Sequence, residues 1–474
     1  MEPISAIEQI EQFLGRIAGT LWGPYALAPV LVIFALGFTI ATKFIQIRRF
    51  GHGVNLVTGR FDDPHDEGSL SHFKALSTAL SATIGLGNIA GVAIAIRTGG
   101  PGAVFWMWVT GLFGMATKYC TCLLAMKYRR VELDGNIRGG PMYYIEDGLG
   151  KKWKPLGIFF AVAVIFSSFG MANLFQTNQV ACEFHRTLGI QPWVTGLLIA
   201  TLVFLVIIGG IRRIGEVAGR IVPLMCVLYV LGAIGVMLLN AKAVPVALAL
   251  IVKSAFTGTA VVGGFKGAAV WFALSWGIRR GIFSNEAGLG SAPIAHSAAK
   301  TKEPVREGLV AMLGPFIDTI VVCTMTATVI IVTGMWKTEG LDAAGNPLTG
   351  AALAQQAFTV GLHKYGGYIV TIAVFFFAYS TCLAWSYYGE KAAEYIGGRV
   401  LVMPYKLFFV VLCFIGAYMA DFKGAAWFDA IINFSDISNA LMAVPNLLAT
   451  LLLLPVVLSL TRDYFDRRER GLLP

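Results

Sequence analysis

Long apolar runs separated by short polar connections constrain this chain more than any other feature of its sequence. Of its 474 residues, 56% are apolar and only 14% are charged, whereas soluble globular chains have roughly 45–50% apolar and about 25% charged residues. This composition excludes a soluble enzyme, a disordered chain and a secreted disulfide scaffold. Because one spanning helix needs about 20 mostly apolar residues, the sequence predicts an all-α membrane protein that crosses the bilayer many times.

We predict eleven spanning helices from the apolar runs that charges, glycines and prolines bound. They lie near 24–47, 75–97, 101–126, 155–180, 194–211, 219–240, 265–290, 306–334, 367–390, 403–420 and 438–461. The segments 7–20, 244–258 and 348–362 are shorter or amphipathic, so we expect them to lie along the membrane surface. The polar loops are too short to hold a core of their own, so residues 1–474 form a single transmembrane domain.

The basic residues fall mainly on one side of the predicted membrane. Numbering the connections alternately puts 27 of the 37 Lys and Arg residues on one side and nine on the other, with Lys118 inside a span. The positive-inside rule assigns the richer side to the cytoplasm. We therefore expect a cytoplasmic C-terminus, an external N-terminus and a net charge of +10 that reflects orientation, with no nucleic acid as a partner.

Two of the predicted spans carry glycine and polar residues at mid-depth. In the second span, Gly85 and Gly87 precede Asn88, and in the seventh, Ser275 and Gly277 lie mid-span. Glycine costs about 1 kcal/mol relative to alanine inside a helix. Opened backbone is tolerated in a membrane only where it lines a cavity. The two spans are therefore predicted to be broken helices.

The two broken spans lie five apart, which predicts an inverted 5+5 repeat. Its first unit would be 75–240 and its second 265–461, with 24–47 as an additional first span. Paired interrupted helices indicate a transporter site, where half-helix N-termini face an anionic group and unwound carbonyls hold Na+. The alternative is close helix packing through small residues. That alternative accounts for one Gly-x-Gly pattern, but not for Asn88 or for the symmetric placement.

Further polar side chains lie at mid-depth in other spans. Ser380 and Thr381 are adjacent hydroxyls in the ninth span, suited either to a hard cation or to back-bonding within their own helix. Trp385 would wall a small pocket or sit at the membrane interface. In the fourth span, Asn173 and Gln176 face either the cavity or an outer loop.

Charged residues within or at the ends of spans are costly and usually paired or functional. Asp318 lies mid-span in the eighth helix, and two roles are open: a second cation or proton site, or a structural partner of a buried amide or lysine. We interpret Glu286, with Arg279 and Arg280, as an inner gate or loop anchor. Lys118 is expected to extend toward the membrane surface.

Three motifs carry a resemblance to a known family. They are Gly85–Val92 (GLGNIAGV), Gly139–Ile145 (GGPMYYI) and Gly281–Pro293 (GIFSNEAGLGSAP). They resemble the bacterial and archaeal alanine or glycine:cation symporter family, and the similarity extends over about 15–465. The resemblance implies sodium-coupled uptake of alanine or glycine across a prokaryotic plasma (inner) membrane. It also implies the inverted-repeat fold of the bacterial leucine transporter.

The same resemblance implies a set of binding residues. The substrate carboxylate would be held by backbone N–H groups near Gly85, Leu86 and Gly87, and its ammonium by Ser275 with nearby carbonyls. The rest of the implied substrate site consists of Asn88, Asn173, Gln176, Leu274, Gly277, Ile278, Thr381 and Trp385. The implied sodium ligands are the carbonyls of Ser81, Ile84 and Phe377 and the hydroxyls of Ser380 and Thr381.

Other functions fit the sequence less well. An integral membrane enzyme would need acids, bases or metal ligands converging at one depth, but the histidines are scattered in loops and the acids within spans are far apart. A channel would need a filter-like or ring-forming motif. Within transport, the alternative is a proton-coupled carrier that uses Asp318. Sodium is the expected coupling ion, and no organic cofactor is expected. The choice between alanine and glycine stays open, and a monomer is compatible with the sequence.

Overall fold

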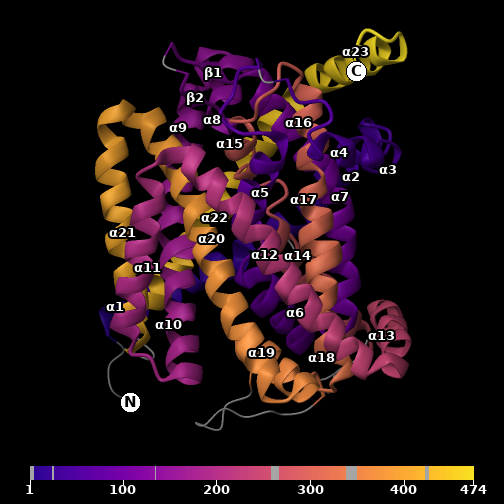
Figure 1. The fold of residues 1–474 in the computed structure, drawn as a ribbon, viewed down its shortest axis with the longest axis vertical. Coiled ribbons are helices and arrows are strands. Elements are labelled where there is room, and N and C mark those ends of the chain that lie inside the picture. The colour runs from indigo at the N-terminus through magenta and orange to yellow at the C-terminus, as the bar shows by residue number, and fades with distance from the viewer. Residues whose placement is uncertain are drawn as a thin grey trace.

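Helices make up almost all of this protein, and the longest ones run side by side along its long axis (Figure 1). The computed structural model describes residues 5–23, 26–63, 65–133, 135–257, 266–337, 348, 350–421 and 426–473. Within them, the one sheet is the short antiparallel hairpin of β1 (Arg130–Val131) and β2 (Ile137–Arg138). The two termini lie at opposite ends of the molecule (Figure 1).

Helices of very different lengths follow one another along the chain. The first thirteen α-helices are α1 (Ala6–Leu21), α2 (Leu27–Ala41), α3 (Ile45–Arg48), α4 (Phe50–Val57), α5 (His72–Thr83), α6 (Val92–Gly99), α7 (Gly102–Lys127), α8 (Pro141–Tyr143), α9 (Lys154–Phe169), α10 (Phe175–Leu188), α11 (Pro192–Ile207), α12 (Gly210–Leu239) and α13 (Val244–Thr257). The others are α14 (Lys266–Asn285), α15 (Ala292–His296), α16 (Pro304–Ala311), α17 (Leu313–Pro315), α18 (Thr324–Val332), α19 (Gly350–Leu362), α20 (Lys364–Gly397), α21 (Val402–Tyr418), α22 (Ala426–Leu452) and α23 (Leu454–Glu469). Short π-helical turns lie at Gly87–Gly91, Tyr144–Gly148, Gly170–Leu174 and Phe316–Cys323, and 3-10 turns at Lys151–Trp153, Ala241–Ala243, Gly398–Leu401 and Met419–Asp421.

Several helical segments are long and apolar enough to cross a membrane. Among the described residues there are five such segments, or seven if each of two bent helix pairs counts as one span. The five are Gly102–Lys127, Lys151–Leu188, Gly210–Leu239, Pro304–Val332 and Tyr365–Asp421. Multiple crossings are thus supported by length and composition, while the count of eleven and the inverted repeat stay predictions.

The first broken helix lies where the glycine pattern predicts it. Helix α5 ends at Thr83, Ile84 has an extended ψ of 86°, and the chain bends by 54° before the second half. The bend brings Gly85 against α20, where an added Cβ atom would lie 2.8 Å from the hydroxyl oxygen of Thr381. A side chain at this position would therefore clash, which explains why the break contains glycine.

The second break is not where the glycine pattern predicts it. Helix α14 continues through Ser275 and Gly277 and ends at Asn285, so the predicted opening at mid-span is wrong. A Cβ atom on Gly277 would lie 2.3 Å from the carbonyl oxygen of Ala103, which means that this glycine allows α14 to pack closely on α7. The chain opens after α14 instead, where Glu286 has a positive φ of 53°.

The ends of the chain and the surface segments also differ in detail from the expected spans. The described parts of the segments expected at the surface form α1, α13 and α19, and α1 exposes apolar side chains such as Phe13. The last expected span, 438–461, crosses a 58° bend after Leu452. Helix α22 begins twelve residues before that expected span, at Ala426.

Candidate functional site

A small pocket lies where the break of the first helix faces the end of α14. Its volume is about 40 Å³. Its walls also include residues of α10, α20 and α22, so five separate parts of the chain meet there. The lining residues are Ala82, Thr83, Gly85, Leu86, Gly87, Met171, Ala172, Gln176, Phe283, Glu286, Thr381, Trp385 and Asn439. We call this space the central pocket.

The central pocket contains about half of the residues expected to bind substrate. Those present are Gly85, Leu86, Gly87, Gln176, Thr381 and Trp385. Met171, Phe283, Glu286 and Asn439 also line the pocket, although they are not among the residues expected from the sequence. A signal existed for Phe283 and Glu286, because both belong to the motif at 281–293.

The part of α14 that lines the pocket lies about two helical turns after the part expected from the sequence. Leu274, Ser275, Gly277 and Ile278 do not line the pocket, and its α14 wall is Phe283. The hydroxyl oxygen of Ser275 is buried and, within the described residues, has no hydrogen-bond partner. These four expected binding residues thus lie in the body of α14, outside the lining of the central pocket.

Two expected amides also lie outside the pocket lining. The side chain of Asn173 donates to the carbonyl oxygen of Phe409 at 2.7 Å and connects α21 to the turn before α10. Asn88 accepts from the N–H of Gly85 at 2.9 Å and donates to the hydroxyl of Ser284 at 3.0 Å. The amide of Asn88 thus stabilises the first break and joins it to the end of α14, and it is not placed to contact a ligand in the pocket.

Asp318 lies against this junction and is completely buried. One of its carboxylate oxygens accepts from the hydroxyls of Ser284 at 2.8 Å and Thr319 at 2.5 Å, and lies 3.4 Å from the amide nitrogen of Asn88. Of the two expected roles, these contacts favour the structural partner of a buried amide. Lys118 does not extend to the membrane surface as expected, because its side chain is only 3% exposed.

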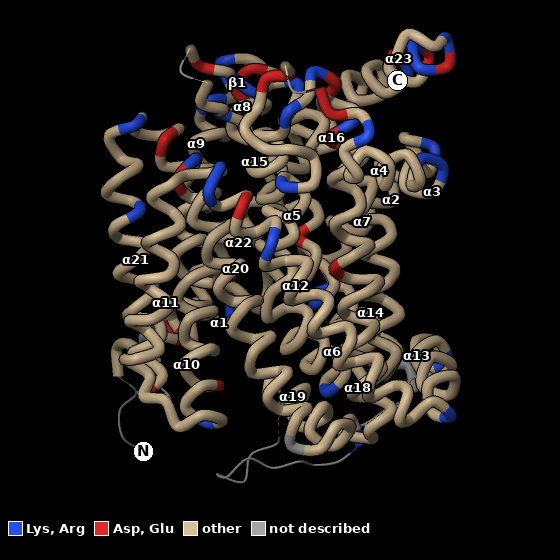
Figure 2. The backbone as a smooth tube through the Cα atoms, in the orientation of Figure 1, with Lys and Arg blue, Asp and Glu red and all other residues tan. Residues whose placement is uncertain are grey.

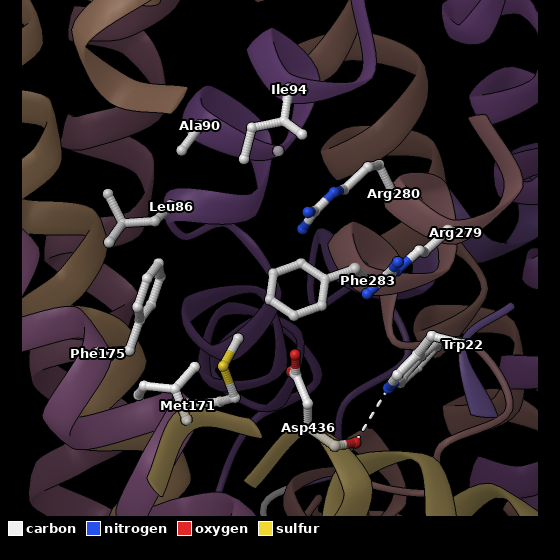
Figure 3. A pocket seen from close by; sticks show the side chains of 12 residues that line it. Trp22, Leu86, Ala90, Ile94, Met171, Phe175, Arg279, Arg280, Phe283 and Asp436 are labelled. Carbon is white, nitrogen blue, oxygen red and sulfur yellow. Dashed lines mark hydrogen bonds between the residues drawn. The ribbon is translucent and has the colours of Figure 1, made fainter. Parts of the chain in front are cut away.

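A larger cavity, which we call the vestibule, adjoins the central pocket. Its volume is about 190 Å³, and it shares Leu86, Met171 and Phe283 with the pocket. Figure 3 shows that the charged side chains of Arg279, Arg280 and Asp436 point into the vestibule. The indole nitrogen of Trp22 donates to the Asp436 carbonyl at 3.0 Å and lies at the rim.

Of the two expected roles of Glu286, the hydrogen bond that it accepts from Ser291 in the segment after α14 favours the loop anchor. The two arginines lie in the body of α14 and line the vestibule, while Glu286 lines the central pocket. Because neither arginine lies in a connection between helices, neither contributes to the charge count that sets orientation. Glu390, another acidic residue within the helices, forms an ion pair with Lys406 at 3.0 Å.

The oxygen atoms expected to hold sodium lie together between α5 and α20. The hydroxyl of Thr381 donates to the carbonyl oxygen of Ser81 at 3.1 Å and to that of Phe377 at 2.9 Å, which is the back-bond expected within its own helix. The hydroxyl of Ser380 is 3.4 Å and 3.0 Å from the same two carbonyls. All four side chains are at most 3% exposed. Two helices thus converge four oxygens, next to the unwound Ile84, in a set whose chemistry fits Na+.

The opposite end of the molecule from the vestibule is closed by buried polar contacts. Glu307 on α16 pairs with His72 on α5 and, at 2.5 Å, with His296 on α15. The exposed fractions of all three side chains are 1% or less. This group, which we call the His–Glu–His cluster, joins α5, the first half of the broken helix, to α15 and α16.

Arg129 fastens the same end of the molecule. Its guanidinium group donates to the backbone carbonyls of Glu67, Ser297, Ala299 and Thr301 at 2.5–3.0 Å. The segments on either side of the arginine also bond to each other, since the N–H of Lys300 donates to the carbonyl of Leu70 at 2.7 Å. The segment just before α5 and the segment just after α15, which we call the two straps, are thereby held together.

Solved structures include a protein of the same fold. The chain resembles the substrate-bound, outward-open state of a Na+-coupled sialic acid symporter, with a TM-score of 0.50 over 86% of this chain and 83% of the other. The two sequences are only 12% identical, so this likeness shows the fold alone.

Sequence comparisons give the family. Residues 7–474 match the model of the sodium:alanine symporter family. The chain is 44% identical to the sodium/alanine symporter AgcS of Methanococcus maripaludis, with 99% of each chain covered. It is also 34% identical to the probable sodium/glutamine symporter GlnT of Bacillus subtilis, over 98% of this chain and 93% of the relative. The chain is a membrane transporter that belongs to the sodium:alanine symporter family.

Proposed function

We propose that this transporter carries a small neutral amino acid, alanine or glycine or both, into the cell together with Na+. The observation that carries the proposal is that Thr381 belongs to both sites. Its side chain lines the central pocket, and its hydroxyl is one of the four converging oxygens between α5 and α20. An ion and a substrate bound on either side of Thr381 would order the same stretch of chain.

The substrate carboxylate would bind at the start of the second half of the first broken helix. Leu86 and Gly87 are in its first turn, where N–H groups have no partner within the helix and the helix dipole is positive. The N–H of Gly85 donates to Asn88 and therefore serves the shape of the break. We thus assign the carboxylate to Leu86 and Gly87, and a supporting role to Gly85.

The size of the central pocket supports a small side chain. About 40 Å³ is room for only a few water-sized groups. Phe283, Met171 and Trp385 form bulky walls around this space. A relative named as a glutamine symporter belongs to the same family, so we expect substrate size to be set by such wall residues and not by the fold.

Sodium would be held by the carbonyls of Ser81, Ile84 and Phe377 and the hydroxyls of Ser380 and Thr381. Binding would fix the break of the first helix against α20. Because the same break presents Leu86 and Gly87 to the substrate, each ligand would raise the affinity of the other by the same factor. The membrane potential adds about 2.3 kcal/mol per charge per 100 mV to this coupling.

Alternating access would then open and close the two ends in turn. The vestibule supports an approach to the central pocket from the end where Trp22 lies. The His–Glu–His cluster and Arg129 support closure at the other end. Release on that side would require these contacts to separate, which assigns the described arrangement to the half of the cycle that faces the vestibule.

The distribution of charge supports an orientation in the membrane. Figure 2 shows Lys, Arg, Asp and Glu residues gathered at the end of the molecule that carries β1, α16 and α23. By the positive-inside rule this end would face the cytoplasm of a prokaryotic cell, and the vestibule would face outward. The substrate would then move inward together with Na+, which moves down its own gradient.

The proton-coupled alternative is not favoured. The chain belongs to a family that is described as sodium:alanine symporters, with sodium as the ion. Asp318, the residue that such a carrier would use, has one oxygen occupied by hydroxyl donors from Ser284 and Thr319.

Uptake into proteoliposomes tests the proposal. We expect alanine and glycine to accumulate when an inward Na+ gradient is imposed, serine to be taken up less, and leucine to be excluded. Uptake that is equal with and without Na+ would contradict the coupling. Uptake of leucine at the rate of alanine would contradict the substrate class.

The ion site is tested by a double substitution with a matched control. Ser380→Ala with Thr381→Ala removes both hydroxyls, and we expect the Na+ concentration for half-maximal uptake to rise at least tenfold, as for the loss of about 1.4 kcal/mol. Ser386→Ala removes another buried hydroxyl of α20, which donates to the Leu383 carbonyl at 2.7 Å. The control should leave the Na+ dependence unchanged, and an unchanged dependence in the double variant would exclude this ion site.

A further inference from the structure

The polar atoms without partners in the central pocket are hydrogen-bond acceptors. Within the described part of the chain, the side-chain oxygens of Gln176 and Asn439 are buried and receive no hydrogen bond. Both residues line the pocket, and so does Glu286, whose carboxylate bonds the indole of a third lining residue, Trp385. Buried acceptors without a donor are costly. A ligand that brings several N–H groups and a positive charge would satisfy them together.

Glu286 is held so that its carboxylate remains at the pocket. It follows the last residue of α14 and has a left-handed φ of 53°, which is uncommon for a residue with a side chain. One carboxylate oxygen accepts from the indole N–H of Trp385 at 3.2 Å, and the other from the hydroxyl of Ser291 at 2.5 Å. Both donors are neutral and orient the carboxylate, and the buried ammonium group of Lys118 on α7 also acts on it electrostatically.

Glu286 lies at the pocket, where the ammonium group of the substrate needs a partner, whereas Ser275 does not. The proposed function assigns the substrate carboxylate to the N–H groups of Leu86 and Gly87, but Ser275 is not at the pocket to receive the ammonium group. Glu286 contributes to the same small pocket from the end of α14. An α-amino acid has its two charges only one carbon apart, so a pocket of this size would hold both ends at once.

We propose that Glu286 accepts the substrate ammonium group and thereby selects amino acids over acids that lack a charged amine. This inference rests on the proposed function and adds a specificity-determining residue to it. Gln176 and Asn439 supply further acceptors for the same group. A hydroxy acid such as lactate brings one O–H donor and no positive charge, so it would add no ion pair to Glu286 in the pocket.

The test compares the binding of alanine with that of lactate and propionate to the purified full chain in the presence of Na+. We expect the unmodified protein to bind alanine at least 100-fold more tightly than either acid. In Glu286→Gln we expect alanine affinity to fall roughly 10- to 100-fold, as for a lost hydrogen bond to a charged group. Lactate affinity should stay within about threefold, so the preference for the amine collapses.

A matched variant separates this role from a structural one. Glu390→Gln removes another carboxylate that is 8% exposed, as Glu286 is, but that pairs with Lys406 and does not line the pocket. It should leave the ratio of alanine to lactate affinity unchanged. If Glu286 only anchors Trp385, Glu286→Gln would weaken alanine and lactate by the same factor, and the proposal would be overturned.

Two further results keep the proposal testable. If Glu286→Gln does not fold, Glu286→Asp retains the charge but shortens the side chain, and its preference should fall between the two. If the unmodified protein binds lactate as tightly as alanine, the role of Glu286 is excluded without any variant. Failure of the proposed function would differ, because then neither alanine nor glycine would bind in a Na+-dependent way.

Discussion

The amide nitrogen of Asn88 lies 3.0 Å from the hydroxyl oxygen of Ser284, and this hydrogen bond joins the break after α5 to the end of α14. The same amide accepts from the N–H of Gly85, and Ser284 in turn donates to Asp318. Asn88, Ser284 and Asp318 are all fully buried. We therefore expect a change at the break to affect the end of α14 without Asn88 or Ser284 touching the substrate.

Asn88→Ala should weaken substrate binding from outside the pocket. The substitution leaves the N–H of Gly85 and the oxygen of Asp318 with fewer partners, and buried groups left unpaired cost about 1–3 kcal/mol each. We expect a lower thermal unfolding midpoint and at least a tenfold weaker Na+-dependent binding of alanine. Asn173→Ala, a buried amide that bonds Phe409, should lose stability but not affinity. Equal effects on affinity would contradict the coupling of the break to the end of α14.

Asp318→Asn should preserve sodium-coupled uptake. An amide oxygen can still accept from the hydroxyls of Ser284 and Thr319, so the junction loses a charge but few hydrogen bonds. We expect the Na+ dependence of alanine uptake to be unchanged within about threefold. The unfolding temperature should fall, because the substitution removes a buried charge from the groups that surround it. Uptake in sodium-free buffer that collapses in this variant would instead restore the proton-coupled alternative.

Ser275→Ala should be nearly neutral for transport. The hydroxyl is buried and lacks a partner among the described residues, so removing it relieves an unpaired polar group and should raise the unfolding temperature or leave it unchanged. Gln176→Ala, which removes a polar group from the pocket itself, should weaken alanine binding at least tenfold. Loss of binding in Ser275→Ala would mean that α14 contributes to the site two turns earlier than we infer.

These contrasts show what could be predicted from the sequence and why. The first break could be predicted because Gly85 and Gly87 are costly within a helix and precede a polar residue, Asn88. The same pattern misled at Gly277, because glycine also serves where two helices touch, and only the position of Ala103 reveals which role applies. The motif at 281–293 marked Glu286, but its pocket role depends on Trp385, which lies on another helix 99 residues away.

The oxygens between α5 and α20 were easier to foresee than the acceptors of the pocket. Adjacent hydroxyls at mid-depth, such as Ser380 and Thr381, are informative by themselves because few other groups in a membrane offer oxygen to a cation. Asn439 had no comparable signal, since it is one of three asparagines spaced along α22 and each is compatible with many neighbours. The three-dimensional arrangement supplies what the pattern lacks, namely which unpaired oxygens face one space.

Arg129→Gln should loosen the closed end of the molecule. Its guanidinium group holds backbone carbonyls on both sides of the contact between the straps before α5 and after α15. We expect amide hydrogen exchange at Ser69, Leu70 and Lys300, whose N–H groups bond across this contact, to accelerate roughly 10- to 100-fold. Arg130→Gln, which removes an exposed ion pair with Asp147, is the control and should leave those amides protected. Unchanged exchange in both variants would show that the straps hold without Arg129.

His52 should make the stability of the protein depend on pH in one direction. Burial, aided by the nearby charge of Arg468, lowers the pKa of His52 from 6.5 to about 4, and its ring bonds the hydroxyl of Tyr464 at 2.8 Å. Between these two pH values the unfolded chain binds a proton that the folded protein does not, so stability is lost as the pH falls from 6.5 toward 4. At roughly 1.4 kcal/mol per pKa unit, the loss is on the order of 2–3 kcal/mol.

Thermal unfolding in detergent at pH 7 and pH 4.5 measures this loss of stability. His52→Gln should show a smaller drop in unfolding temperature than the unmodified protein, although it starts lower because it loses the bond to Tyr464. His65→Gln, at an exposed histidine, should behave like the unmodified protein, and an equal drop in all three would exclude His52 as the titrating group.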